Sequence, residues 1–340
     1  MDSPDRPPRS LSRGIRRRDL LRLGALGTVG LVAACASDRQ VTPAPATPPP
    51  ALRPWGAFIP SVLPAAGSTR SPLQQLATLA GAPPKYVHRF AAIGDPVPTA
   101  ELDAIATTGA TPLLTLEPWR PDGGVDQPDH SLARIAAGAF DTQFASWADG
   151  LASWGKPVLL RFAQEMNGTW YPWSIGVNGN TAADYRAAWA RMHSVMHEAR
   201  IPSVQFVWAP NVLTPGTNPF ADAYPGSDLV DVLGLDGYNW GEQPGHHWQA
   251  ATDLFAPSLD ALREIDGTHP ILVTEVASAD GPSPEDKAGW IRDFFTLIQS
   301  QSRVEGFVWF QMDKERDWRF NSTPASTAAF RAGVAGLGLR

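Results

Sequence analysis

Short apolar runs recur eight times between residues 53 and 340, and segments with helical periodicity separate them. Continuously apolar runs of this length are typical of strands that are buried on both faces of a parallel sheet. Several of the runs end in a charged or polar residue, which marks the point where a strand reaches the surface. The runs lie at 55–59, 86–90, 113–116, 157–160, 204–208, 230–235, 271–275 and 306–310.

The intervening segments carry helix start signals. Ser71, Thr181, Ser283 and Thr323 each precede a helical pattern, and a proline follows three of them directly. A hydroxyl at the N-cap accepts a backbone N–H bond, and proline suits the first helical position. We expect further helices over 99–108, 138–154 and 248–265. Strands that alternate with helices predict an α/β fold, and eight such units predict a single (β/α)8 barrel domain over 53–340.

One segment at the end of the fourth run, residues 161–173, concentrates functional side chains. It reads Arg-Phe-Ala-Gln-Glu-Met-Asn-Gly-Thr-Trp-Tyr-Pro-Trp. The carboxyl ends of the strands form the active-site face of a (β/α)8 barrel. A strand that ends in arginine, amide and carboxylate and then opens into aromatic residues therefore predicts the site here. The alternative is a surface carboxylate beside core tryptophans.

This segment closely resembles the acid/base segment of glycoside hydrolase family 26, a group of endo-acting β-mannanases and β-glucanases. The resemblance runs over most of residues 53–340. It implies a retaining glycoside hydrolase in which Glu165 is the acid/base and Glu275, at the end of the seventh run, is the nucleophile. The chemistry needs two carboxyl groups that flank the scissile bond. Position alone leaves open which carboxyl has which role.

The resemblance also implies residues that contact the substrate or the catalytic pair. Tyr238 would hydrogen-bond the nucleophile, Trp309 would lie beneath the sugar, and Arg161 would hold a carboxylate through two bonds. The substrate-binding set it implies is His88, Trp119, Arg161, Gln164, Trp170, Tyr238 and Trp309. The alternative for His88, Trp119, Tyr238 and Trp309 is ordinary barrel packing. Among other acids at strand ends, Glu117 is expected to support the pair.

Gln164 departs from the family, which usually has histidine immediately before the acid/base glutamate. Glutamine is neutral at every pH and still donates a hydrogen bond. We therefore expect a different electrostatic environment for Glu165, with a shifted pH optimum or sugar preference. Both carboxylates remain, so activity is still expected.

The substrate expected first from the resemblance is β-1,4-mannan or glucomannan. Residues 236–241, Asp-Gly-Tyr-Asn-Trp-Gly, look somewhat closer to the mixed-linkage β-1,3-1,4-glucanase branch, which stays as the alternative. Thirteen tryptophans suit a cleft in which aromatic faces stack on sugar rings. A rival of another class is a carbohydrate-binding lipoprotein without catalysis, but such a protein would be expected to lack Glu165 or Glu275.

Other partners are not expected. The net charge of −6 and the lack of a basic stripe after the first forty residues argue against nucleic acid. Neither a metal-ligand spacing nor a phosphate-binding glycine loop is present, so no metal or organic cofactor is expected. His246 and His247 are expected in a solvated or sugar-contacting loop. Residues 313–319 are expected to form a salt-bridged surface loop, with Trp318 as a possible distal sugar contact. We expect a monomer.

The first 35 residues predict export. Arg16 and Arg17 open a segment that resembles a twin-arginine signal, and residues 32–35, Val-Ala-Ala-Cys, resemble the lipobox of a bacterial lipoprotein. We therefore expect an exported bacterial protein, either secreted or lipidated at Cys35, whose only membrane contact is that anchor. The alternative is an ordinary export signal with an incidental cysteine. Residues 36–52 are a proline-rich linker that would hold the domain off the membrane.

Overall fold

The computed structural model describes residues 53–201 and 204–338. The predicted export segment 1–35 with Cys35 and the linker up to residue 52 lie outside the described residues. Eight parallel strands pair in chain order, and β8 pairs with β1 to close a barrel. The strands are β1 Trp55–Phe58, β2 Tyr86–Ala92, β3 Thr111–Glu117, β4 Val158–Phe162, β5 Val204–Trp208, β6 Val232–Asn239, β7 Ile271–Ser278 and β8 Val304–Phe310. The predicted (β/α)8 barrel is confirmed.

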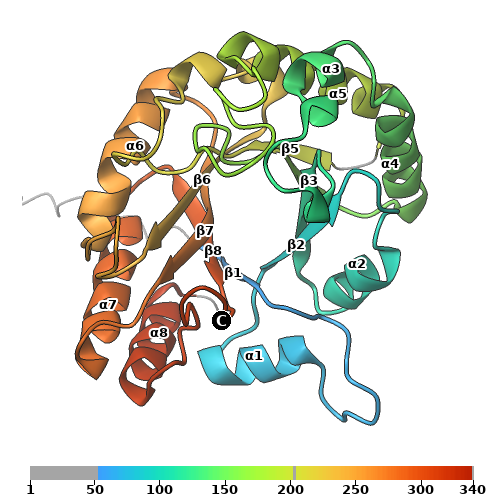
Figure 1. Cartoon of the computed structure of the whole chain (residues 1–340). Coiled ribbons are helices and arrows are strands. Elements are labelled where there is room, and N and C mark those ends of the chain that lie inside the picture. The colour runs from blue at the N-terminus through green and yellow to red at the C-terminus, as the bar shows by residue number, and fades with distance from the viewer. Residues whose placement is uncertain (1–52, 202–203, 339–340) are drawn as a thin grey trace, which may run out of the picture. The chain divides into compact units, whose positions relative to one another are not determined.

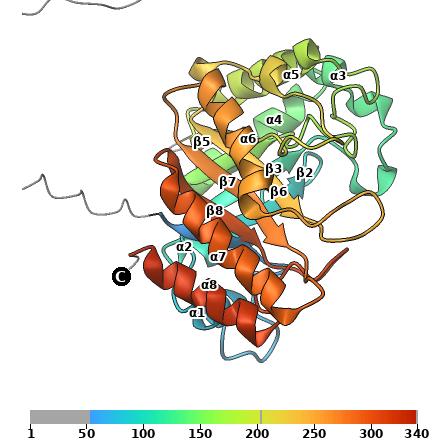
Figure 2. The same cartoon turned by 90° about the vertical axis from the view of Figure 1, so that its left-hand side faces the viewer.

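Helices surround the strands, as the view along the barrel in Figure 1 and the side view in Figure 2 show. They are α1 Pro72–Ala80, α2 Thr99–Ala106, α3 Leu132–Ala136, α4 Asp141–Trp154, α5 Ala182–Glu198, α6 Ala251–Ile265, α7 Pro284–Ser300 and α8 Pro324–Gly336. The four predicted N-cap residues all form capping boxes with the third residue of their helix. In the described part of the chain, no helix is both long and apolar enough to cross a bilayer.

Two helical connections differ from a regular barrel. The helix predicted over 138–154 starts only at Asp141, because Gly138 with a φ of 89° separates it from the short α3. Between β5 and β6 the described chain contains the 3₁₀ turns Ala221–Ala223 and Ser227–Leu229.

Two apolar layers hold the fold together. A small cluster fills the lower barrel interior with Leu113, Leu159, Val207, Val232, Leu272 and Val308. A much larger cluster packs the outer faces of the strands against the helices. Side chains alternate between the two faces along a strand. Two residues beyond Leu113 and Leu159, Thr115 and Arg161 therefore also point inward, above the apolar layer.

Five predicted strands continue past the residue where the sequence placed their ends; β2 runs to Ala92 and β3 to Glu117. β4 includes Arg161, and β6 runs through Asp236 and Tyr238 to Asn239. β7 extends three residues beyond Glu275. The polar residues expected at the ends of these strands lie inside the barrel and bond to one another. The register of β6 and β7 shifts near these residues.

Candidate active site

A cavity of about 1060 Å³ opens at the carboxyl ends of the strands. Its lining combines four carboxyl groups with a large aromatic surface, a composition that suits a ligand-binding cleft. The carboxyl groups are Glu117, Glu165, Glu275 and Glu315, and the aromatic residues are Phe58, Phe90, Trp119, Trp170, Tyr171, Tyr238, Trp240, Phe310 and Trp318. The structure thus brings both predicted catalytic residues to one cavity.

Glu165 lies three residues beyond β4 in an unusual backbone conformation. Its φ is 54° and that of Ala163 is 46°, values in the left-handed region that non-glycine residues rarely adopt. The Glu165 amide donates to the carbonyl of Ala209 at 2.8 Å, which ties the turn to the end of β5. Backbone strain of this kind is tolerated where the surroundings fix it and clusters at functional sites.

Two side-chain donors hold the Glu165 carboxyl. Asn211 Nδ2 donates to Oε1 at 2.8 Å, and Trp170 Nε1 donates to Oε2 at 2.7 Å. Burial raises the pKa of Glu165 to about 7, and the nearby Glu275 carboxylate acts in the same direction against these donors. A carboxyl group with a pKa near 7 retains a proton around neutral pH, which is what a general acid requires.

Glu275 has a different environment on β7. Tyr238 Oη donates to its Oε2, and Arg161 donates to its Oε1 in a buried ion pair. Donors of this type, above all a guanidinium, stabilise the carboxylate form. An ionised carboxylate is the form that attacks an anomeric carbon.

Arg161 bridges two carboxylates and does not grip one through two bonds. It is fully buried, and it donates one N–H to Glu275 and another to Asp236 Oδ2. Its Nε donates to Thr115 Oγ1 at 2.7 Å. Burial raises the pKa of Asp236 well above its ordinary value, although Arg161 opposes this shift. The predicted bidentate contact is corrected accordingly.

His88 does not contact the cavity, which corrects its predicted contact with sugar hydroxyls. The side chain is fully buried, and its Nε2 lies 2.7 Å from Thr115 Oγ1 and 3.1 Å from an Arg161 nitrogen. Burial, together with the charges of Arg161 and Arg89, lowers its pKa well below the usual value. His88 is therefore a neutral group that packs beneath Arg161.

Trp309 lies on the wrong face of β8 to support a sugar. Val308 points into the barrel and Phe310 lines the cavity, so Trp309 between them points toward the helices. It is fully buried against Trp290 of α7 and Phe330 of α8. The predicted sugar platform at Trp309 is therefore wrong, and the aromatic residues that this part of the chain gives to the cavity are Phe310 and Trp318.

Gln164 is also buried behind the cavity wall and does not line it. Its Nε2 donates to Glu117 Oε1 at 2.8 Å, while its backbone carbonyl accepts from Trp173 Nε1 at 2.6 Å. The predicted direct contact with substrate is corrected to a contact with Glu117. That carboxyl lines the cavity, and burial raises its pKa to about 7 against the Gln164 hydrogen bond.

Trp119, Trp170 and Tyr238 line the cavity. His246 and His247 also reach it, in an exposed loop where the His246 ring stacks on Trp240. The predicted salt bridges within 313–319 are present, between Lys314 and Glu315 and between Arg319 and both Asp313 and Asp317.

Two residues of the site, Asn211 and Phe310, were not predicted from the sequence. Asn211 follows β5 directly after Ala-Pro, where a polar side chain at a strand end is the available signal. Phe310 was read as the last apolar residue of a strand, and inward orientation follows only from the register. Among residues 53–201 and 204–338, no group of three or more histidine, cysteine, aspartate or glutamate side chains is arranged to hold a metal ion.

Comparisons with known proteins agree with this geometry. The model of the family described as Glycosyl hydrolase family 26 matches residues 125–289. Endoglucanase H of Acetivibrio thermocellus is 33% identical over 238 residues, which are 68% of this chain and 25% of that protein. A mannan endo-1,4-beta-mannosidase of Bacillus subtilis is 34% identical over 101 residues, 27% of each chain. This chain therefore spans about a quarter of the length of these relatives.

A solved endo-beta-1,4-mannanase of Cellulomonas fimi has the same fold, with a TM-score of 0.63 over 83% of this chain and 70% of that one. At a sequence identity of 17%, this similarity supports a shared fold and no shared activity. The family match and the curated relatives support the predicted enzyme class, a glycoside hydrolase.

Proposed function

The chain carries a glycosyl hydrolase family 26 domain, and from that premise we propose that it is a retaining endo-β-glycanase. One observation carries the proposal. Two carboxyl groups face the same cavity in opposite environments: Glu275 accepts from a guanidinium and a phenol, while Glu165 is buried with a raised pKa. That difference supports Glu275 as the nucleophile and Glu165 as the acid/base.

The reaction would proceed by double displacement. A Glu275 oxygen bonds to the anomeric carbon as the bond to the leaving oxygen breaks, and Glu165 gives its proton to that oxygen. In the second step, the Glu165 carboxylate takes a proton from water. The water oxygen then bonds to the anomeric carbon, and the ester to Glu275 breaks. We expect the two carboxyl groups to be separated by about 5 to 5.5 Å, as retention of configuration requires.

The substrate proposed first is β-1,4-mannan or glucomannan, which the mannosidase relatives support. Mixed-linkage β-1,3-1,4-glucan is the second candidate. A specific observation favours a glucan: the match to Endoglucanase H covers 68% of this chain, against 27% for the mannosidase of Bacillus subtilis. The aromatic lining suits stacking on either backbone.

The test is release of reducing ends from galactomannan, glucomannan and mixed-linkage glucan by the wild-type protein and Glu275→Ala. We expect release from at least one polymer and a loss of about 10³-fold or more in the variant. The anomer formed first, read by NMR, should have the configuration of the substrate. A folded wild-type protein that cuts none of the polymers would contradict the proposal in favour of another β-glycan or of a binding-only protein. Full activity in Glu275→Ala would overturn the assignment of Glu275 as the nucleophile.

We also propose that the domain acts outside a bacterial cell as a monomer, either released or held by a lipid on Cys35. The signal-like residues 1–35 and the proline-rich linker support this. Replacement of Cys35 by serine should move the protein from the membrane fraction to the soluble one. A distribution that does not change would contradict lipidation.

A further inference from the structure

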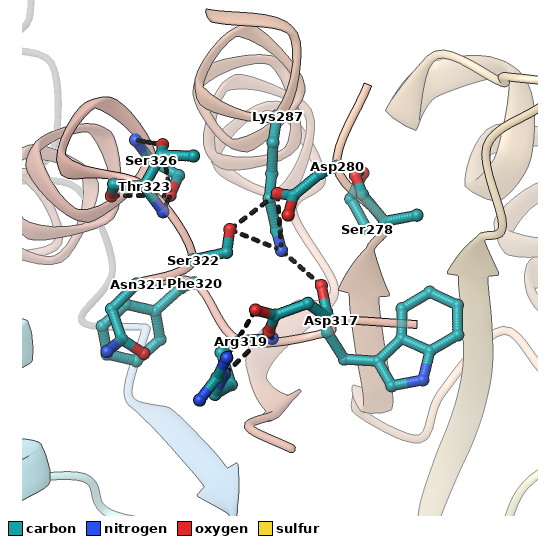
Figure 3. A network of polar contacts seen from close by, with 12 residues as sticks. Ser278, Asp280, Lys287, Asp317, Arg319, Phe320, Asn321, Ser322, Thr323 and Ser326 are labelled. Atoms are coloured by element: carbon teal, nitrogen blue, oxygen red, sulfur yellow. Dashed lines mark hydrogen bonds and ion pairs between the residues drawn. The ribbon is translucent and has the colours of Figure 1, made fainter. Parts of the chain in front are cut away.

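A buried lysine lies behind one wall of the cavity. Lys287, in the first turns of α7, has a side chain that is 1% exposed. Its ammonium donates to the carbonyl of Asp317 at 2.6 Å and to Ser322 Oγ at 3.1 Å, and it lies 3.3 Å from Asp280 Oδ1 (Figure 3). Ser322 Oγ in turn donates to Asp280 Oδ1 at 2.6 Å. One cation therefore joins α7, the chain after β7 and the loop after β8.

The cost of burying this cation indicates what it contributes. Burial lowers the pKa of Lys287, while the carboxylates of Asp280 and Asp317 act in the opposite direction. A buried ion pair often gives little net stability compared with apolar residues of similar size. The ammonium has three N–H donors, and three acceptors surround it, so its geometry is fully specified. We therefore infer that the Lys287 ammonium contributes mainly by fixing the positions of the segments that it joins, and less by adding net stability.

What it fixes is the β8–α8 loop, residues 311–323. The loop contributes Met312, Lys314, Glu315 and Trp318 to the cavity lining. The carbonyl that Lys287 binds belongs to Asp317, immediately before Trp318. The Trp318 amide donates to Met312 O at 3.0 Å, and its carbonyl accepts from Trp309 Nε1 at 2.9 Å. Both the amide and the carbonyl of Trp318 are thus held by hydrogen bonds.

Trp318 contacts the residue that bonds the nucleophile. Its ring centroid lies 5.1 Å from that of Tyr238, at an interplanar angle of 60°. Tyr238 Oη donates to Glu275 Oε2. The other contact of Lys287, Asp280, follows the end of β7, the strand that carries Glu275. We call the contacts of Lys287 with Asp280, Asp317 and Ser322 the brace; it connects to Glu275 through the Trp318 ring and the Tyr238 hydroxyl.

We propose that Lys287 is a positioning residue for the reaction: it fixes Trp318 in the cavity wall, and so orients the Tyr238 hydroxyl on Glu275. The inference rests on the proposed function, because it gives Glu275 the role of nucleophile. It extends the site to a residue on α7 that does not line the cavity.

The kinetic test is a double-mutant cycle. Lys287→Met should lower kcat/KM by about 10- to 100-fold, the size of effect expected from a displaced catalytic group. In the Tyr238→Phe background the same change should cost less than about 2-fold, because the contact through which it acts is already lost. Equal losses in both backgrounds would overturn the inference. Ser322→Ala, which removes one acceptor, should give a smaller loss in the same direction if Lys287→Met does not fold.

The matched control is Arg53→Met. Arg53 is also a buried cation that donates to backbone carbonyls, those of Val304 at 3.0 Å and Gln301 at 3.1 Å. Val304 is the first residue of β8 and Gln301 follows the end of α7, at the end of the barrel opposite the cavity. Its loss should lower stability and leave kcat/KM unchanged. If Arg53→Met lost as much kcat/KM as Lys287→Met, the effect of Lys287 would be one on general stability, and the positioning role would be overturned.

A second readout does not depend on activity. Hydrogen exchange in Lys287→Met should accelerate in the peptides that cover 311–322 and 236–240, and Arg53→Met should leave both unchanged. If the wild-type protein cuts no β-glycan, the proposed function fails while this measurement still tests the brace. Unchanged exchange at 311–322 in Lys287→Met would overturn the positioning role whichever polymer is cut.

Discussion

The pKa of Glu165 depends on a residue that the sequence did not single out, and this gives a sharp test. Asn211 Nδ2 donates to Glu165 Oε1 at 2.8 Å, and this hydrogen bond favours the carboxylate and lowers its pKa. Asn211→Ala removes the donor and leaves the burial that raises the pKa to about 7. The neutral acid then becomes relatively more stable, so the pKa of Glu165 should rise further.

The expected size follows from the type of bond. A hydrogen bond to a charged group contributes about 1.5 to 3 kcal/mol net, and about 1.4 kcal/mol corresponds to one pKa unit. Water can replace part of the lost bond at the edge of an open cavity, so we expect a rise of about 1 unit. A general acid is active when protonated, so the alkaline limb of kcat/KM should move from about pH 7 to about pH 8.

The assay is the initial rate at low substrate concentration, measured for wild type and variant from about pH 5 to about pH 9. Asn218→Ala is the matched control, because it deletes an exposed amide in the same loop. The control should keep the wild-type profile. An alkaline limb of Asn211→Ala that stays in place, or that moves to lower pH, would refute the assignment of Glu165 as the acid whose ionisation sets this limb.

Two further outcomes are expected. Arg161→Met should lower kcat by at least about 100-fold and cost about 3 to 5 kcal/mol of stability, because it leaves the carboxylates of Asp236 and Glu275 without their guanidinium; a urea midpoint and a kcat near wild type would contradict this. Asp266→Asn should destabilise the fold by about 2 to 4 kcal/mol at pH 7, because Asp266 accepts from Tyr224 Oη and the Thr268 amide. These donors depress the pKa of Asp266 although burial opposes them. The hydrogen bonds of the Asp266 carboxylate therefore stabilise the wild type above about pH 4, and this contribution is lost as the pH falls below that value. The variant has no carboxylate at this position, so it should not show this loss. Urea unfolding of both proteins at pH 7 and below about pH 4 would test the difference.

The architecture was predictable because its signals are local. Ser71, Thr181, Ser283 and Thr323 start helices wherever their hydroxyls can accept a backbone N–H, and the apolar runs fill a closed parallel sheet. Glu165 and Glu275 were placed at one mouth because the carboxyl ends of parallel strands meet there. These inferences need only the order of residues along the chain.

The errors share a different cause. Whether Trp309 faces the cavity or the helices depends on one residue of register, and β7 and β8 carry register shifts that no pattern reveals. His88 and Gln164 were expected to contact the substrate because the resemblance to the family implied it. In the fold they lie one layer deeper, where they bond to Thr115 and Glu117. Depth along the barrel axis follows from strand tilt and pairing, not from residue type.

The charge balance of the cavity floor explains why three of its four acids, Glu165 among them, favour the protonated form. Glu117, Glu165, Asp236 and Glu275 are all buried in the part of the chain that the structure describes, and Arg161 is the guanidinium that pairs with two of them. One positive charge cannot balance four negative ones in a site of low dielectric, so protons must supply the remainder. In the proposed first step Glu275 loses its charge as it forms the ester, while Glu165 gains one as it releases its proton. The total charge around Arg161 stays constant, so the step requires no new buried charge.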